Sequence, residues 1–211
     1  MTQPQFELAR AIHSAADLLV GKPHDEKDLR EALSLIEAAN ALLDGGEDLT
    51  LEHRALVFAS EMVEEFGADV PADGVPFDAF ALSPFSGAHN ALRPQELVYR
   101  RKGEEIHAEM IAGRAYEGAP DRVHGGLTAA VFDDVMGALQ RVVHHYGYTR
   151  TLHVSYLGRV PIDEPVHFVA RLTEFDQRTF TMTAEASYAG EKVAAAKAIF
   201  TEIDFEMFNS M

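Results

Sequence analysis

The feature that most constrains the fold is one long predicted helix, residues 125–146, surrounded in sequence by segments with the two-residue period of β-strands. Its apolar residues recur at helical spacing and form one wide stripe: Ala129, Ala130, Val131, Val135, Ala138, Leu139, Val142 and Val143. Strand patterns occupy residues 96–102, 105–116, 149–158, 165–175, 178–189 and 192–203. A single helix with strands on both sides in sequence predicts an α+β fold, in which an antiparallel sheet wraps around the helix.

The strand that follows this helix carries polar residues at alternate positions. Strict alternation over 149–158 places one set of side chains on one face: Arg150, Leu152, Val154 and Tyr156. It places the other set on the opposite face: Thr149, Thr151, His153 and Ser155. Because one sheet buries one helix poorly, we expect a homodimer, or a dimer of dimers, that completes the sheet or covers the helix end.

The N-terminal part of the chain differs from the rest in charge. Residues 1–80 hold 17 acidic and 5 basic residues, a balance of −12, which leaves −4 of the net charge of −16 to the remainder. Amphipathic patterns predict three helices there: 5–20, 26–44 and 51–66. Proline, glycine and aspartate are frequent over 67–96, as is typical of a connecting segment. We predict three parts: an acidic helical extension over 1–75, a connector over 76–96 and the sheet domain over 97–211.

Composition excludes several classes of protein. The chain has no cysteine, which rules out disulfides, thiolate nucleophiles and cysteine-bound metals. A net charge of −16 argues against nucleic acid as a partner, because phosphate binding needs clustered Lys and Arg. No apolar run approaches the roughly 20 residues of a membrane span, and charged residues interrupt the N-terminus where a signal peptide would be apolar. We expect a cytoplasmic protein that uses no metal and no cofactor.

The start of the long helix carries the residues best suited to bind or catalyse. Residues 123–134 read Val-His-Gly-Gly-Leu-Thr-Ala-Ala-Val-Phe-Asp-Asp. A Gly-Gly step at a helix start leaves backbone N–H groups open to a ligand, where the helix dipole favours negative charge. Asp133 follows Gly125 by eight residues, a little over two turns at about 3.6 residues per turn, so both fall near one helix face. Asp134 points about 100° away from Asp133, so the two carboxylates do not share that face.

These residues resemble hotdog-fold thioesterases of the PaaI type. The similarity spans about residues 84–204. It rests on His124-Gly125-Gly126, the aspartate nine residues after the histidine, the connector 83–90, Tyr116-Glu117-Gly118, and Val154-Ser155-Tyr156 followed by Val160-Pro161. The resemblance implies a hotdog fold and hydrolysis of an acyl-CoA thioester at a site built across a dimer interface.

The resemblance also implies a role for each matched residue. Asp133 is the implied nucleophile, or the base that activates water, and Gly125 offers the N–H that polarises the thioester carbonyl. Thr149 would orient the water, and His124 would hold the loop or contact the thioester. As further substrate-binding residues we expect Gly126, Asp134 and Arg159.

The chain departs from the family pattern at two places. Gly118 stands where some relatives have Asn or Gln. Leu157 and Gly158 stand where relatives often have basic residues that lead to the CoA phosphates, and Arg159 where proline is usual. The candidates for a positive patch are Arg93, Arg122, Arg150, Arg159 and Arg178.

Simpler interpretations stay open at this level. Asp133 fits a solvated helix face, the Gly-Gly step a tight turn, His124 a loop-structuring residue, and Thr149 an ordinary strand former. A non-catalytic acyl-CoA-binding or protein-interaction module on the same fold is the main functional alternative. A hotdog hydratase fits less well, because that chemistry needs a His/Asp or His/Glu pair aimed at the acyl α and β carbons.

Overall fold

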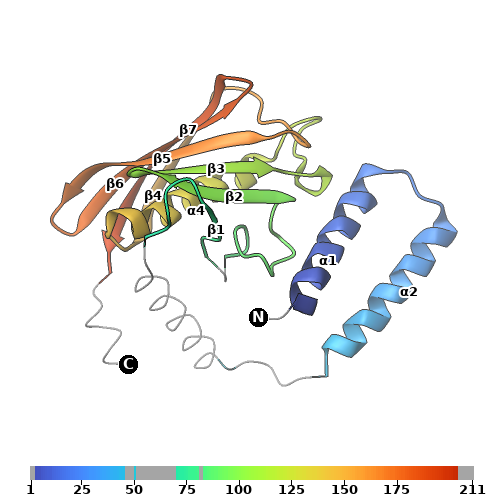
Figure 1. The fold of residues 1–211 in the computed structure, drawn as a ribbon. Coiled ribbons are helices and arrows are strands. Elements are labelled where there is room, and N and C mark those ends of the chain that lie inside the picture. The colour runs from blue at the N-terminus through green and yellow to red at the C-terminus, as the bar shows by residue number, and fades with distance from the viewer. Residues whose placement is uncertain (1–2, 46–49, 51–69, 81–82, 204–211) are drawn as a thin grey trace.

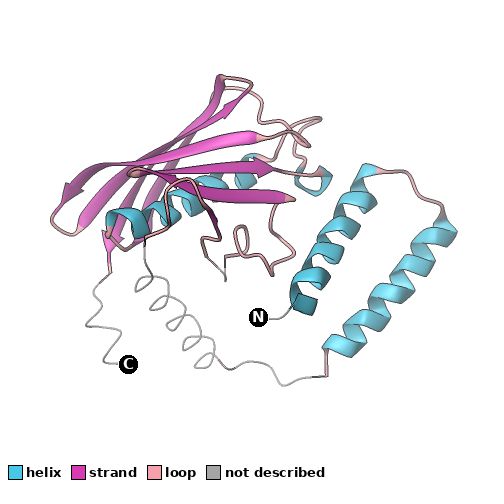
Figure 2. Ribbon diagram, viewed as in Figure 1, coloured by secondary structure: helices cyan, strands magenta, loops and turns pink. Residues whose placement is uncertain are grey.

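The computed structural model describes residues 3–45, 50, 70–80 and 83–203. The helices are α1 (Gln3–Gly21), α2 (Glu26–Leu43) and α4 (Gly125–Val143), with a short 3-10 turn η1 (Arg114–Tyr116). The strands are β1 (Pro76–Phe77), β2 (Glu96–Lys102), β3 (Glu105–Ile111), β4 (Gly147–Tyr156), β5 (Val166–Asp176), β6 (Thr179–Tyr188) and β7 (Glu191–Glu202). They form one antiparallel sheet in the order β1-β2-β3-β5-β6-β7-β4, which Figure 2 shows as the magenta layer.

The sheet curves around α4, as Figure 1 shows. The hairpin β2–β3 lies on one side of the sheet, whereas β4, which follows α4 directly, lies at the opposite edge. The meander β5-β6-β7 then fills the space between them. This arrangement confirms the α+β hotdog fold predicted from the sequence, with β1 as an added strand inside the segment predicted to be a connector.

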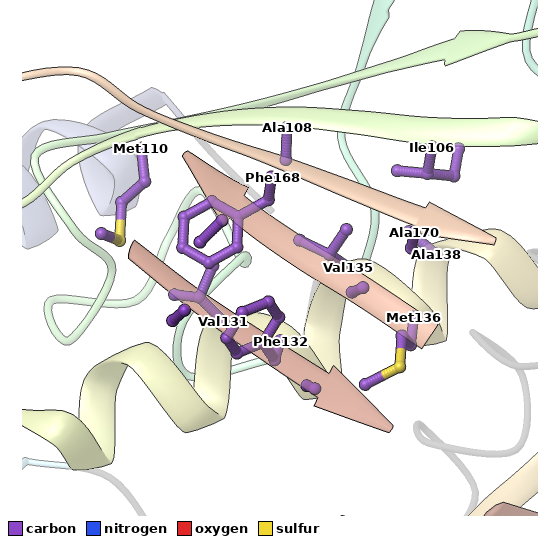
Figure 3. Close-up of a cluster of buried hydrophobic side chains, with 14 of the residues drawn as sticks. Ile106, Ala108, Met110, Val131, Phe132, Val135, Met136, Ala138, Phe168 and Ala170 are labelled. Carbon is purple, nitrogen blue, oxygen red and sulfur yellow. The ribbon is translucent and has the colours of Figure 1, made fainter. Parts of the chain in front are cut away.

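The apolar stripe of α4 forms the centre of the core. Val131, Phe132 and Val135 have no exposed surface, and the ring of Phe132 meets that of Phe168 edge-on at 5.2 Å (Figure 3). The buried residues of the strands include many alanines: Ala108, Ala170, Ala184, Ala186, Ala194, Ala196 and Ala198. Small side chains on the buried face allow the helix to approach the strands closely at the packing density of a protein interior.

A β-bulge in β4 corrects the face predicted for Thr149. Thr149 pairs with Phe200 and Thr151 pairs with Ile199, so Arg150 is an extra residue with no opposite partner. Beyond the bulge, Tyr156 pairs with Ala194. Phe200 and Ala194 are both buried and lie six positions apart on β7, so their partners Thr149 and Tyr156 share the face that looks toward α4. The strict alternation predicted for this strand was therefore wrong at Thr149.

The two described N-terminal helices lie beside the sheet domain. α1 and α2 occupy the segments where the periodicity predicts helices, and the third predicted helix, 51–66, lies outside the described residues. α1 buries only Ala9 and contacts η1, whereas α2 has no buried residue. No helix within the described ranges is both long enough and apolar enough to cross a membrane.

Candidate active site

His124 caps the N-terminus of α4. The N–H of Gly126 donates to His124 Nδ1 at 3.0 Å, and the N–H of His124 donates to the carbonyl of Tyr116 at 2.8 Å. These two bonds hold the histidine to both sides of the loop. Because the Gly126 amide is already bonded to His124, the Gly125 amide is the glycine N–H available to a ligand. A Cβ atom on Gly118 would lie 3.0 Å from the Cα of His124. The departure from the family pattern at Gly118 therefore has a steric reason.

Tyr156, to which the sequence analysis gave no role, holds the first residue of α4. Its hydroxyl donates to the carbonyl of Gly125 at 2.8 Å. Its ring lies so close that a Cβ atom on Gly125 would sit 3.2 Å from it. Glycine is therefore favoured at position 125, because any side chain there would crowd the tyrosine ring. The strand β4 therefore sets the position of the helix start from one side, while His124 sets it from the other.

Asp133 and Thr149 form the second part of the site. The hydroxyl of Thr149 donates to Asp133 Oδ1 at 2.8 Å, which fixes the carboxylate against β4. Asp133 is half-buried and Thr149 is exposed. The bulge at Arg150 is what turns Thr149 toward the helix. The structure thus brings together Asp133 and Thr149, two of the four residues expected to be catalytic.

Asp134 lies against the connector and not beside Thr149. The hydroxyl of Ser83 donates to Asp134 Oδ2 at 2.7 Å, and accepts the N–H groups of Phe85 and Ser86 at 3.1 and 3.2 Å. Burial raises the pKa of Asp134 to about 6, although the hydrogen bond from Ser83 opposes the rise. The two adjacent aspartates therefore have separate environments: one faces β4 and the other holds the connector on α4.

Two of the cations expected to receive CoA have partners within the protein. Arg159 pairs with Asp121, which belongs to the loop just before His124. Arg93 donates to the carbonyl of Leu97 at 2.6 Å. Arg122 and Arg150 have exposed side chains. The first two cations are thus engaged with the protein itself, and the exposed pair is freer to meet a phosphate.

The arrangement supplies the parts that acyl transfer needs. An N-terminal helix amide with the dipole behind it can stabilise an oxyanion, and a carboxylate fixed by a hydroxyl can accept a proton. Among the described residues, no group of three or more His, Asp or Glu side chains is placed to hold a metal ion. The contacts missed from the sequence, those of Tyr156 and Ser83, join segments far apart along the chain. The only sequence signal for these contacts was the position of Tyr156, at the end of the same strand that carries Thr149.

Part of this chain matches a described family. Residues 115–201, which include the loop, α4 and strands β4 to β7, match the family model described as acyl-CoA thioesterase N-terminal domain. Among curated proteins no significant match is found.

Solved structures resemble this chain in fold. A protein described as a thioesterase superfamily protein is 21% identical, with a TM-score of 0.74, and the match covers 94% of this chain and 90% of that one. A hypothetical thioesterase from Streptococcus pneumoniae, solved with coenzyme A, is 15% identical with a TM-score of 0.48, covering 51% of this chain and 89% of that one. The thioesterase superfamily member 2 from Mus musculus is 18% identical with a TM-score of 0.46, covering 50% and 80%.

Proposed function

We propose that this chain, which matches the acyl-CoA thioesterase family model over residues 115–201, hydrolyses an acyl-CoA thioester to the free acid and CoA. The observation that carries the proposal is the hydrogen bond from Thr149 to Asp133, which holds a carboxylate on the helix whose first amide is free to bind an oxyanion. A fold alone does not specify a reaction, so the proposal depends on this pair of groups.

The reaction has two forms that use the same residues. In the first, Asp133 takes a proton from water as the water oxygen attacks the thioester carbonyl, and the Gly125 N–H stabilises the resulting oxyanion. The C–S bond then breaks, and the proton from Asp133 passes to the CoA thiolate. In the second, Asp133 attacks the carbonyl itself, releases CoA and leaves a mixed anhydride that water hydrolyses. Thr149 keeps the carboxylate oriented in either case.

The spacing of residues along α4 favours a site shared between two protomers. Gly125 and Asp133 are eight residues apart, which at about 1.5 Å per residue places them about 12 Å apart along the helix axis. One carbonyl carbon and its attacking water span far less than that. We therefore propose a homodimer with antiparallel α4 helices at its interface, in which the Gly125 amide of one protomer serves the Asp133 carboxylate of the other. β4, the terminal strand of the sheet, exposes Tyr148 and Tyr156 and fits such an interface.

A thiol-release screen over short, long and aryl acyl-CoAs tests the function. We expect hydrolysis of some member of the panel, and a fall in kcat of about 100-fold or more for Asp133→Asn. Asp176→Asn, which removes a carboxylate from the exposed end of β5, serves as the matched control and should keep full activity. Binding of acyl-CoA with no turnover over the whole panel would favour the non-catalytic binding module instead.

Subunit mixing tests the shared site. Gly125→Pro removes the amide donor at the first helical position, where proline is well tolerated, and His124 already has the extended backbone that precedes proline (φ −59°, ψ 134°). Dimers of Gly125→Pro with Asp133→Asn would contain one intact site and one doubly altered site. Random mixing should therefore restore up to about a quarter of wild-type activity from two inactive proteins. No restoration from folded, mixed dimers would show that each site lies within one protomer.

Oxygen labelling separates the two forms of the reaction. With enzyme in excess over substrate in ¹⁸O-water, attack by water puts the label in the product acid during the first turnover. If Asp133 attacks and water then opens the anhydride at the aspartyl carbonyl, the product receives an unlabelled carboxylate oxygen and the label stays on the aspartate, so label on Asp133 identifies the anhydride.

A further inference from the structure

We propose that α1 is a positioning element for the oxyanion loop, and that Asp17 is the residue through which it acts. The inference rests on the proposed function, because it concerns the placement of the Gly125 amide. The N-terminal helices have no role in the family resemblance, which begins near residue 84. α1 nevertheless contacts η1, the turn that leads into the loop before α4; Figure 2 shows this short helix beside the upper end of α1.

Asp17 holds η1 directly. Its Oδ1 accepts the N–H of Ala115 at 2.7 Å, across 98 residues of sequence. Amides in the first turn of a helix lack partners within the helix, and a carboxylate is a strong acceptor for them. A Cβ atom on Gly113 would overlap the Asp17 carboxylate, so the chain has room for this contact only because residue 113 is glycine. The carboxylate is therefore inserted against the backbone of the turn.

His13 completes the contact one turn earlier on α1. Its Nε2 lies 3.3 Å from Asp17 Oδ2, and its Nδ1 lies 3.3 Å from the carbonyl oxygen of Ala91 in the connector. Its ring stacks on that of Tyr116 with centroids 5.8 Å apart and an interplanar angle of 28°. The side chains of His13 and Asp17 are 12% and 22% exposed, so both are held at the interface between α1 and the loop.

Tyr116 carries these contacts to the active-site loop. The carbonyl of Tyr116 accepts the N–H of His124 at 2.8 Å, and the next residue, Glu117, forms a β-bridge with Val123. His124 in turn accepts the amide of Gly126. A single hydrogen bond therefore connects Tyr116, whose ring packs on α1, to His124, which caps α4. A displacement of η1 would shift His124, and with it the Gly125 amide.

Turnover kinetics of Asp17→Ala, Asp17→Asn and Glu7→Ala test the inference. Asp17→Ala removes the acceptor for Ala115, and Asp17→Asn keeps an acceptor oxygen. Glu7→Ala removes a carboxylate from the exposed side of α1, where Glu7 bonds only to the side chain of Gln3 in the described structure. We expect kcat to fall about 10-fold for Asp17→Ala with KM within about twofold, because a loop displaced by a fraction of an ångström weakens a contact made in the transition state. Asp17→Asn should recover most of that loss, and Glu7→Ala should show none.

Amide hydrogen exchange separates positioning from folding and from the proposed reaction. Asp17→Ala should speed exchange over residues 113–126 while the strands β5 to β7 keep their protection, and Glu7→Ala should leave both unchanged. Unchanged exchange over 113–126, or a kcat equal to wild type in a protein that is active, would overturn the inference. Absence of thioesterase activity in wild type would refute the proposed function by itself, because the exchange measurement tests the contact without turnover.

Discussion

Replacement of Asp134 by asparagine tests the burial of this carboxyl against the connector. The pKa of Asp134 is raised from 3.8 to about 6, mainly by burial; the hydrogen bonds from Ser83 and Ser86 oppose the rise, and the charge of Asp133 adds to it. The net rise of roughly two pKa units corresponds to about 3 kcal/mol at 1.36 kcal/mol per unit. This is the free energy by which the folded chain is disfavoured when Asp134 is ionised, relative to the protonated state.

The sign of the effect on stability follows from proton binding. Between pH 3.8 and about 6, the folded chain binds more protons at Asp134 than the unfolded chain does. The free energy of unfolding therefore falls as the pH rises through this window, and the loss is complete above about pH 7. Asparagine has no proton to lose and still offers an oxygen to Ser83. Relative to wild type, the free energy of unfolding of Asp134→Asn should rise by about 1.4 kcal/mol between pH 5 and pH 8.

Urea unfolding followed by circular dichroism at pH 5 and pH 8, at one protein concentration, measures this difference. Comparison at the same two pH values cancels the contributions of the other titrating groups. Ser83→Ala provides a second variant: it removes a donor that favours the charged carboxylate, so it should destabilise the chain more at pH 8 than at pH 5. If the free energy of unfolding of Asp134→Asn minus that of wild type stays constant or falls from pH 5 to pH 8, the assigned burial is refuted.

Two further changes probe the site itself. Gly125→Pro should lower kcat by about 100-fold or more because it removes the oxyanion donor. Gly125→Ala is the control, because it keeps the amide and adds only a Cβ atom near the exposed ring of Tyr156. Equal activity of the two variants in the thiol-release assay would contradict the role of the amide. Thr149→Val removes the hydroxyl that holds the Asp133 carboxylate, so kcat should fall by about 10-fold. A folded Thr149→Val variant that retains full activity would show that Thr149 does not act on Asp133.

The sequence predicts the elements well because each rests on a local pattern. The apolar stripe that predicts α4 contains Val131 and Val135, both without exposed surface, and the strand predicted over 96–102 coincides with β2. The pair Gly125 and Asp133 is also readable, because helical spacing alone places both near one face of α4. Periodicity depends only on residues close together in the chain, so it can be read without knowing the tertiary structure.

The contacts that give the site its shape leave no such local pattern. The hydrogen bonds from Ser83 to Asp134 and from Ala115 to Asp17 join residues 51 and 98 positions apart. The bulge at Arg150 breaks the alternation on which the face of Thr149 was predicted, and no glycine or proline marks it. The ion pair of Arg159 with Asp121 likewise depends on two loops that meet only in the folded chain. Each of these requires the tertiary arrangement to be known.

The β-bulge has a consequence for the spacing of residues in β4. Thr149 and Tyr156 are seven positions apart, an odd number, and in a regular strand an odd separation sends two side chains to opposite faces. Both must reach α4, one to hold the carboxylate and the other to hold the helix start. Because the extra residue has no partner on β7, Thr149 and Tyr156 pair with residues that are six positions apart, and so they share a face. The length of this segment is therefore as much a part of the active site as the identity of its side chains. A relative without the bulge would need the threonine and the tyrosine six positions apart, not seven.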